Sequence, residues 1–318
     1  GGAAPNSEAA FRAAVRSRQE CVEVDVARTR DGRLVSVHAR QLGPVVDGAR
    51  RHKRLWRRLE SLRRRELGAV PRGLQAGDWS WEELQALPWD PGAAPSSVET
   101  ALEILLGLDE TKQSPAFSKS PLRQITLDLK PWVVEGEVRD GDVLAVAIAD
   151  LVRSFQCDRC LIWAKDDALV QTVSDLSSPA ARVGFVAMNE TARHRSSGQE
   201  DLGRFRRLPN VRAVALHFAM AVDEGVVREG QARGLSVQAW TASSPRVAAA
   251  VLDAGVDAVV TDRPAMLRRG IQERAQWCQL AGGGAMTAAP AEARLFVGGL
   301  GPDVTREDVM ERFAPFGE

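Results

Sequence analysis

Apolar and polar residues alternate along most of the chain in a pattern that predicts strands and helices in turn. Short apolar runs bounded by polar residues, glycine or proline are typical of buried strands. Such runs lie at residues 21–26, 34–38, 124–129, 160–164, 183–188, 213–217, 235–240 and 258–261. Apolar residues recur at helical spacing in residues 7–18, 98–106, 143–155, 167–176, 224–233, 246–254 and 265–274. The alternation predicts an α/β protein with a parallel sheet, closed or open, that is buried on both faces.

Two segments depart from this alternation. Residues 50–66 hold nine Lys or Arg and two Glu, with leucines at helical spacing, which predicts a basic amphipathic helix within an insertion at 43–78. Its charged side either faces water or contacts an anionic membrane or RNA. Residues 280–293 are rich in alanine and glycine and lack periodicity, which predicts a linker that we place at 276–293.

The composition is that of a soluble globular protein, with 44% apolar and 26% charged residues in a chain of 318. Lys and Arg balance Asp and Glu, so no overall charge favours nucleic acid. No run of about 18 apolar residues is present, and we expect a cytoplasmic or organellar protein that does not span a membrane. Because the chain begins at Gly1 without an initiator Met, a targeting segment further upstream stays open.

Four cysteines are too few for a disulfide-stapled secreted fold in a chain of this length. Cys157 and Cys160 have the C-x-x-C spacing, but a structural zinc site needs four ligands and the sequence holds no second close pair. We therefore expect two ordinary cysteines, with a thioredoxin-like redox pair as the alternative.

Two acidic residues, Glu23 and Asp25, interrupt the apolar run at 21–26. Strand alternation puts both carboxylates on one side, where burial and mutual repulsion disfavour their charged forms. A hard divalent cation bound by carboxylate oxygens relieves both effects, whereas an exposed edge strand with two solvated acids is the simpler alternative. His38 closes the next apolar run after a Thr-Arg-Asp-Gly turn signal. Such a His suits a general acid or base near a metal, although a strand-end His is often structural.

The segment EVDVARTRDGRLVSVH resembles the signature of the glycerophosphodiester phosphodiesterases, in which an E-x-D pair leads through a T-x-D-G turn to a catalytic His. Other segments resemble that family, in the same order, along about residues 1–270. They are Pro5-Asn6-Ser7 with the Ala10-Phe11 helix start, the short segment WEEL, a helix start at 95–102, the strand ITLDLK, the strand VQAWTAS and the closing AGVDAVVTDRP. The ordered set carries the resemblance, because each piece alone is common.

This resemblance implies a TIM-type β/α barrel of the phospholipase C-like phosphodiesterase kind. It implies hydrolysis of a glycerophosphodiester substrate to sn-glycerol 3-phosphate and an alcohol. It also implies Mg²⁺ or Ca²⁺ bound by Glu23, Asp25 and Asp128, with His38 as acid or base and Lys130 beside the phosphoryl oxygens.

Two further residues are candidates for contact with the substrate. The resemblance implies that Trp240 forms an apolar wall against it. Lys165 is not part of the resemblance, but it follows a predicted strand, and TIM barrels carry their sites at the carboxyl ends of strands. His217 also ends a predicted strand, where a structural role is the simpler expectation.

The sequence also departs from the family pattern. The family's first catalytic His and its phosphate-contacting Arg belong to an H-R-G motif that would end at Gly1 or Gly2, so both would lie upstream. The first barrel strand would lie upstream too, which would leave two strand edges unpaired. His38 is followed by Ala39, where the family usually has Asp, and residues 50–66 replace a glycine-rich loop. We therefore expect impaired turnover, with a catalytically inactive protein that binds glycerophosphodiesters or anionic lipid as the alternative.

The final segment, RLFVGGLGPDVTREDVMERFAPFGE, resembles the opening of an RNA-recognition motif. Residues 295–300 match its RNP2 strand, where Phe296 is the candidate to stack on an RNA base. The sequence stops at Glu318, before the rest of that sheet, so we expect RNA binding, as a fusion protein, only if the motif is completed further along. The expected domains are a barrel at 1–275 and a partial recognition motif at 294–318, with no prediction of oligomeric state.

Overall fold

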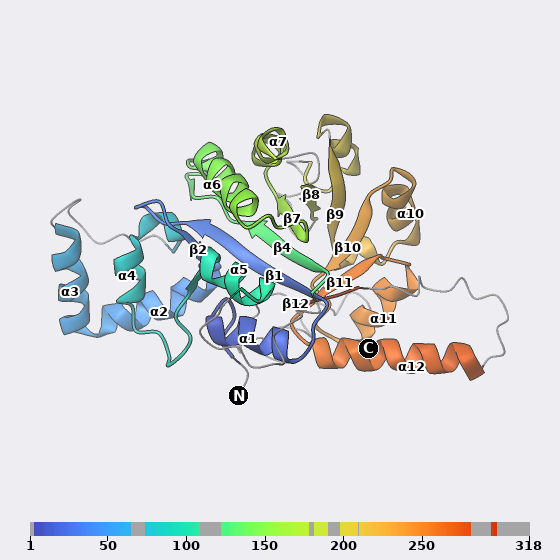
Figure 1. Ribbon diagram of the computed structural model, residues 1–318, viewed down its shortest axis with the longest axis horizontal. Helices are drawn as coiled ribbons and strands as arrows, with labels where there is room; N and C mark the ends of the chain where they lie inside the picture. Colours follow the sequence, from blue (N-terminus) through green and yellow to red (C-terminus); the bar gives the residue numbers. More distant parts are fainter. Residues whose placement is uncertain are drawn as a thin grey trace.

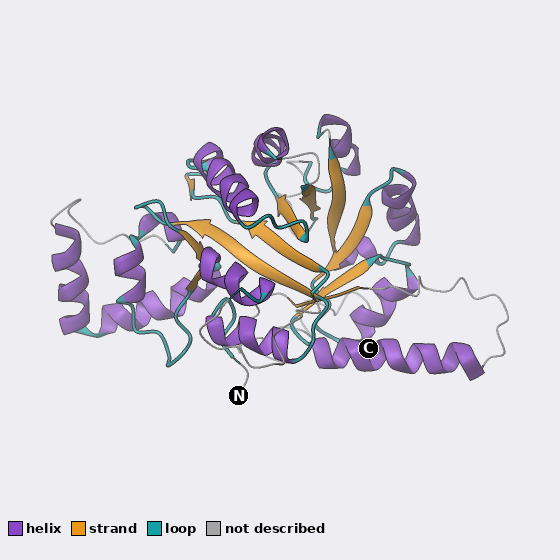
Figure 2. Cartoon of the chain, in the orientation of Figure 1, coloured by secondary structure: helices purple, strands orange, loops and turns teal. Residues whose placement is uncertain are grey.

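A sheet of parallel strands forms the centre of the molecule. The computed structural model describes residues 3–64, 74–108, 122–177, 181–189, 198–208, 210–280 and 294–297. Ten strands form the larger sheet, in the order β12-β11-β10-β9-β8-β7-β4-β1-β2-β3. From β12 to β1 neighbouring strands run parallel, and β2 and β3 extend the sheet in antiparallel fashion. The parallel strands wind into a TIM-type β/α barrel with helices on the outside (Figure 1, Figure 2).

The element bounds follow the predicted pattern closely. The strands of the larger sheet are β1 Cys21–Arg28, β2 Leu34–Ser36, β3 Ser96–Ser97, β4 Gln124–Leu129, β7 Cys160–Ala164, β8 Arg182–Ala187, β9 Val211–His217, β10 Ser236–Trp240, β11 Ala258–Thr261 and β12 Arg294–Val297. The barrel helices are α1 Glu8–Arg16, α5 Val98–Leu106, α6 Gly141–Ser154, α7 Asp167–Leu176, α9 Phe218–Ala221, α10 Glu224–Ala232, α11 Pro245–Asp253 and α12 Pro264–Leu280. The strands expected at 124–129, 160–164 and 258–261 are confirmed to the residue.

Alternate side chains of the strands divide between two apolar layers. Leu161 and Trp163 of β7 and Ala213 and Ala215 of β9 belong to a cluster in the barrel interior. Side chains at the intervening positions, such as Ile162, pack outward against the helices. A strand buried on both faces has no polar face, which explains the continuous apolar runs in the sequence.

Strand β12 lies between β11 and β1. From the sequence we expected this position, that of the first barrel strand, to be empty. The strand pairs in parallel with β11, from Ala258 opposite Arg294 to Thr261 opposite Val297, and it lies beside β1 (Figure 1). A lone strand and helix cannot bury a core of their own, whereas the edge of β11 offers unpaired backbone groups. The strand expected at 295–300 therefore joins the barrel sheet, and the RNA-recognition motif gains no support.

The linker predicted at 276–293 starts too early. Helix α12 continues to Leu280. The rest of that linker, at 281–293, and the remainder of the predicted recognition motif, at 298–318, lie outside the described residues, as does the side chain of Phe296.

The basic segment forms two helices rather than the single helix expected at 50–66. Helix α2, Ala39–Arg51, ends next to His52, and α3, Lys53–Arg64, begins directly after it. Their apolar sides pack with Trp79 and with helix α4, Trp81–Gln85, in a second core outside the barrel. Among the helices that the structure describes, none combines the length and the apolar character needed to span a bilayer.

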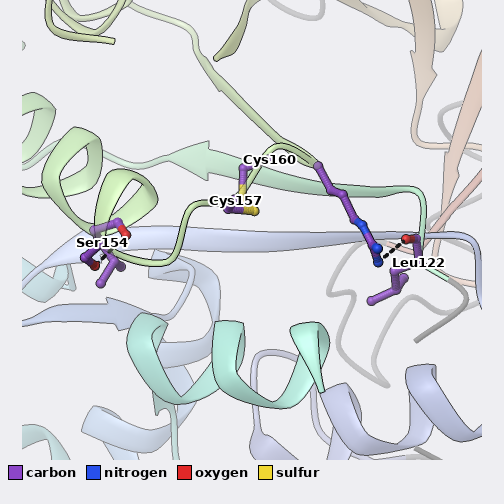
Figure 3. The surroundings of a disulfide bond; sticks show 6 residues. Leu122, Ser154, Cys157 and Cys160 are labelled. Atoms are coloured by element: carbon purple, nitrogen blue, oxygen red, sulfur yellow. Dashed lines mark hydrogen bonds between the residues drawn. A yellow bond between two sulfur atoms is a disulfide. The ribbon is translucent and has the colours of Figure 1, made fainter. Parts of the chain in front are cut away.

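Cys157 and Cys160 form a disulfide bond, which corrects the expectation of two ordinary cysteines. The chain leaves α6 at Ser154, turns through Gln156 at a φ of 47° and starts β7 at Cys160, so the two Cα atoms are 5.4 Å apart (Figure 3). Cys157 and Cys160 are only 5% and 1% exposed, which restricts attack by an external thiol. The bond lies at the amino end of β7 and therefore tethers a helix to its strand far from the strand's carboxyl end.

Candidate active site

Three carboxylates meet on two neighbouring strands. Glu23 and Asp25 lie on β1 and Asp128 lies on β4, where Asp25 and Asp128 are opposite each other in the register. One ligand oxygen from each carboxylate lies within 4.8 Å of the other two. Asp25 is 3% exposed and Asp128 is 7% exposed, so the alternative of an edge strand with solvated acids is wrong. We call these three residues the acidic cluster.

Lys130 directly follows β4 and brings positive charge to the acidic cluster. Its Nζ contacts Oδ2 of Asp128 and lies 3.1 Å from Oδ1 of Asp25. Its backbone N–H donates to the carbonyl of Val26 on β1 at 2.8 Å, which fixes its position. Burial acts to lower the pKa of Lys130, but attraction by Asp128, Asp25 and Glu23 outweighs burial and raises the pKa. Lys130 is therefore a cation at neutral pH.

The two carboxylates of β1 have pKa values shifted in opposite directions. Burial raises the pKa of Glu23 well above its usual value, and repulsion from Asp128 and Asp25 raises it further. Burial also acts to raise the pKa of Asp25, but the charge of Lys130 and a hydrogen bond from Asn6 contribute to lowering it overall. Of the two carboxylates on β1, Glu23 thus takes up a proton more readily than Asp25.

Asn6 holds the carboxylate of Asp25 and is a site residue that sequence reasoning missed. Its Nδ2 donates to Oδ2 of Asp25 and to Oε1 of Gln41, each at 2.8 Å. Its Oδ1 accepts from the hydroxyl of Ser36 at 2.8 Å and from the backbone N–H of Asp25 at 3.4 Å. Asn6 is buried and has a φ of 58°, a conformation in which asparagine is enriched. Its signals in the sequence were a place in the Pro5-Asn6-Ser7 segment and a position just before the first helix.

His38 joins the acidic cluster to α2. We expected it to close a strand, but β2 ends at Ser36 and His38 is the N-cap of α2. Its Nδ1 accepts the backbone N–H of Arg40 at 3.2 Å, and its own backbone N–H donates to Oε1 of Gln41 at 2.8 Å. Burial lowers the pKa of His38 to about 4, against the attraction of Asp25. The imidazole is therefore neutral at pH 7, with its hydrogen on Nε2 because Nδ1 accepts.

Lys165, Trp240 and His217 form a second group at the carboxyl ends of the strands. Lys165 follows β7, and His217 and Trp240 close β9 and β10, where they are opposite each other in the register. Nζ of Lys165 lies 5.2 Å from the centre of the Trp240 ring, within the range of a cation–π contact. The ring of His217 meets the Trp240 ring edge to face, with centres 5.2 Å apart. The two predicted substrate contacts thus lie together, and their contact with substrate stays a prediction.

The acidic cluster suits a divalent cation. Oδ1 of Asp128 is buried and has no hydrogen-bond partner among the residues that the structure describes. Carboxylates offer oxygen atoms, the ligands that Mg²⁺ and Ca²⁺ take in proteins. The donors therefore fit the metal that the sequence resemblance implies, and Glu23, Asp25 and Asp128 are the residues that would hold it.

A parallel β/α barrel with a group of carboxylates, a lysine and a histidine near the carboxyl ends of its strands defines a class of metal-assisted hydrolases. The Glycerophosphoryl diester phosphodiesterase family matches residues 1–266, and the chain belongs to this family. The chain is 26% identical over 275 residues to glycerophosphodiester phosphodiesterase GDPD4 of Arabidopsis thaliana, an alignment that covers 85% of this chain and 69% of the plant protein.

Solved structures share the fold. A glycerophosphoryl diester phosphodiesterase from Silicibacter pomeroyi superposes with a TM-score of 0.64 at 18% identity, over 86% of this chain and 90% of the other. A glycerophosphodiester phosphodiesterase from Parabacteroides distasonis gives a TM-score of 0.60 at 16% identity, over 86% and 92%. An Oleispira antarctica phosphodiesterase, solved in complex with the product sn-glycerol-3-phosphate, gives 0.57 at 18% identity, over 85% and 92%.

Proposed function

We propose that this chain hydrolyses glycerophosphodiesters to sn-glycerol 3-phosphate and an alcohol with the help of Mg²⁺ or Ca²⁺. The observation that carries the proposal is the acidic cluster with Lys130 beside it, in a chain that belongs to this enzyme family. The Oleispira antarctica relative, which was solved with sn-glycerol-3-phosphate, supports the same product here.

The charges of the site are arranged to receive a phosphodiester. A cation bound at the acidic cluster supplies Lewis-acid polarisation of a phosphoryl oxygen. Lys130 stays protonated beside Asp25 and Asp128, so its Nζ can donate to a second phosphoryl oxygen as negative charge develops there. Asn6 holds Asp25 through two hydrogen bonds, one to its carboxylate and one from its backbone N–H.

His38 is the residue placed to donate a proton to the reacting oxygen of the diester. The imidazole is neutral at pH 7 because its pKa is lowered to about 4. The backbone N–H of Arg40 occupies the lone pair of Nδ1, so Nε2 carries the hydrogen of the neutral ring and can donate it in a hydrogen bond to the leaving oxygen of the diester. Gln41 fixes the backbone of His38, which orients the ring toward the acidic cluster.

The group around Trp240 suits the rest of the substrate. The indole N–H of Trp240 donates to the carbonyl of Ala215 at 3.2 Å, which holds the ring in place at the end of β10. Its apolar surface can cover the carbon skeleton of glycerol, and Lys165 over the same ring adds a positive charge that favours an anionic diester.

Release of sn-glycerol 3-phosphate from glycerophosphocholine and glycerophosphoethanolamine tests this function. The assay is run with Mg²⁺, with Ca²⁺ and with a chelator, on the unmodified chain, on Glu23→Gln and on Glu137→Gln, whose side chain is 72% exposed and serves as the matched control. We expect turnover that a chelator abolishes, that added metal restores, and that Glu23→Gln loses while Glu137→Gln keeps it.

Absence of hydrolysis would contradict the proposal. If the folded protein cleaves neither diester with either metal, the family fold serves binding alone. If hydrolysis persists unchanged in the chelator, the acidic cluster is not a metal site.

A further inference from the structure

Helix α3 exposes four positively charged side chains on one side. These are Lys53, Arg54, Arg57 and Arg58. Helical spacing places them together, and we call this side the cationic face. The opposite side is used in packing, because Leu59 is buried and Leu55 and Trp56 are half-buried in the second core. Glu60 lies three residues after Arg57 and is half-buried.

The cationic face works against the stability of its own helix. Lys53 and Arg57 are four residues apart, as are Arg54 and Arg58, and like charges at this spacing repel. Two of the cations lie in the first turn of α3, which holds no acidic residue, and the positive end of the helix dipole disfavours them there. Because the whole chain has a net charge of zero, this accumulation is local. An anionic partner would neutralise these like charges, so relief of their repulsion would add to the free energy of binding.

Helix α3 lies on the side of the molecule toward which the catalytic end of the barrel points (Figure 1). Helix α2 starts at His38 in the candidate active site and leads directly into α3. The carboxyl ends of β1 and β4 point toward the side of the molecule where α2, α3 and α4 lie (Figure 1). A flat partner bound to α3 would therefore lie on the same side as the acidic cluster.

We propose that the cationic face docks the protein on an anionic phospholipid membrane. This proposal rests on the proposed function in one respect. Glycerophosphodiesters carry the head group and glycerol of a phospholipid, so a deacylation reaction at a membrane must supply them. A surface that needs only clustered Lys and Arg, with the apolar side of the helix already buried, fits peripheral attraction to anionic lipid.

RNA fits the cationic face less well. Proteins that bind single strands combine positive charge with exposed aromatic rings on which bases stack. The aromatic residue of α3, Trp56, is half-buried in the second core and is covered by the guanidinium of Arg50, 5.6 Å from the ring centre. The described part of α3 therefore offers charge without a stacking platform.

Vesicle sedimentation with the full chain tests the docking. One set of vesicles is phosphatidylcholine alone and the other contains roughly one third phosphatidylglycerol, in low and in physiological salt. The test variant carries Lys53→Gln, Arg54→Gln, Arg57→Gln and Arg58→Gln, which keep helix propensity and remove charge. The matched control carries Arg123→Gln, Arg139→Gln, Arg153→Gln and Arg228→Gln, which remove the same charge from four well-exposed, ion-paired positions elsewhere.

We expect selective binding to the anionic vesicles that weakens as salt rises. The α3 variant should lose on the order of 10²- to 10³-fold in partition coefficient, while the control loses less than about tenfold. If the α3 variant fails to fold, the salt dependence and lipid selectivity of the unmodified chain still decide the question. Hydrolysis of soluble glycerophosphocholine by the α3 variant should equal that of the unmodified chain.

Three results would overturn the docking: equal binding to both kinds of vesicle, unchanged binding by the α3 variant, or tighter binding to a single-stranded RNA probe than to anionic vesicles. Failure of the proposed function has a different signature. In that case no diester is hydrolysed, yet the unmodified chain still sediments with anionic vesicles and the α3 variant does not.

Discussion

The acidic cluster and the cationic face are both groups of like charge, but the first is buried and the second is exposed. Asp25 and Asp128 are almost fully enclosed, and Lys130 has to lie against both of them. The four cations of the cationic face on α3 are exposed to solvent. Water and dissolved ions screen the second group, whereas the protein itself has to neutralise the first.

The difference can be put in energies. Two unit charges 4 Å apart interact by about 1 kcal/mol when bulk water separates them, but by about 4 kcal/mol at the lower effective dielectric inside a protein. Charge substitutions in the acidic cluster should therefore change activity strongly, and those on α3 should hardly change the folded molecule.

Asp128→Asn should reduce kcat/KM for glycerophosphocholine on the order of 10³-fold. The substitution keeps the shape of the side chain but removes one of three charges that hold the cation, whose Lewis-acid contribution is worth several kcal/mol. Steady-state kinetics at saturating Mg²⁺ or Ca²⁺ measures the loss. Asp142→Asn, at an exposed position in the first turn of α6, is the control and should be unchanged. A loss below tenfold would show that Asp128 does not hold the metal.

His38→Gln should reduce kcat on the order of 10²-fold, because it removes the group that exchanges a proton with the substrate. In the metal-free protein the His38 imidazole should stay neutral until the pH falls to about 4. An unfolded His takes up its proton near pH 6.5. The stability contributed by neutral His38 is therefore complete above about pH 6.5 and is lost as the pH falls toward about 4. NMR titration of the imidazole carbons checks this, and a midpoint near 6.5 would show that the ring is not desolvated.

Asn6→Ala should weaken metal binding by about 10- to 100-fold, the usual cost of losing a hydrogen-bond partner of a metal ligand. Calorimetric titration with Ca²⁺ measures this without any need for turnover. Asn210→Ala is the matched control, because Asn210 also has a positive φ, 68°, but is exposed. Equal affinities in the two variants would mean that Asp25 keeps its orientation without Asn6.

Arg57→Gln should raise the free energy of unfolding by about 0.3 kcal/mol, since it relieves the repulsion with Lys53. The corresponding removal of a cation from the buried region, Lys130→Gln, should lower it by about 3 kcal/mol, because Asp25 and Asp128 then lose their partner. Urea unfolding of both variants in chelator gives the two values. If both variants changed the free energy of unfolding in the same direction, the charges of the two regions would not differ in their effect on stability.

Most of the barrel could be predicted from the sequence because its strands are buried on both faces. Such strands appear as apolar runs with polar ends, and the run at 160–164 became β7 without any shift. Helix α2 was missed because Gly43, Pro44 and Gly48 lie inside it, and these residue types normally argue against a helix. Packing of Leu42 and Val46 in the second core compensates for that low propensity.

The candidate site could be predicted where its residues lie at alternate positions of a strand. It could not be predicted where the chain turns. Glu23 and Asp25 share a face by strand alternation, and Asp128 reaches them through the pairing of β1 with β4. Asn6 reaches Asp25 only because a positive φ turns its side chain inward before α1 begins. No periodic pattern encodes such a contact. The Cys157–Cys160 bond likewise depends on the turn at Gln156.

The strand β12 has a consequence for how the protein is made. Its neighbours in space, β1 and β11, begin at Cys21 and Ala258, whereas β12 itself begins at Arg294. A ribosome therefore translates both neighbours before it translates the strand that lies between them. Until then the growing barrel presents open β-edges, which readily recruit other chains. The interval between translation of β11 and pairing of β12 is thus a period in which these edges are open to other chains.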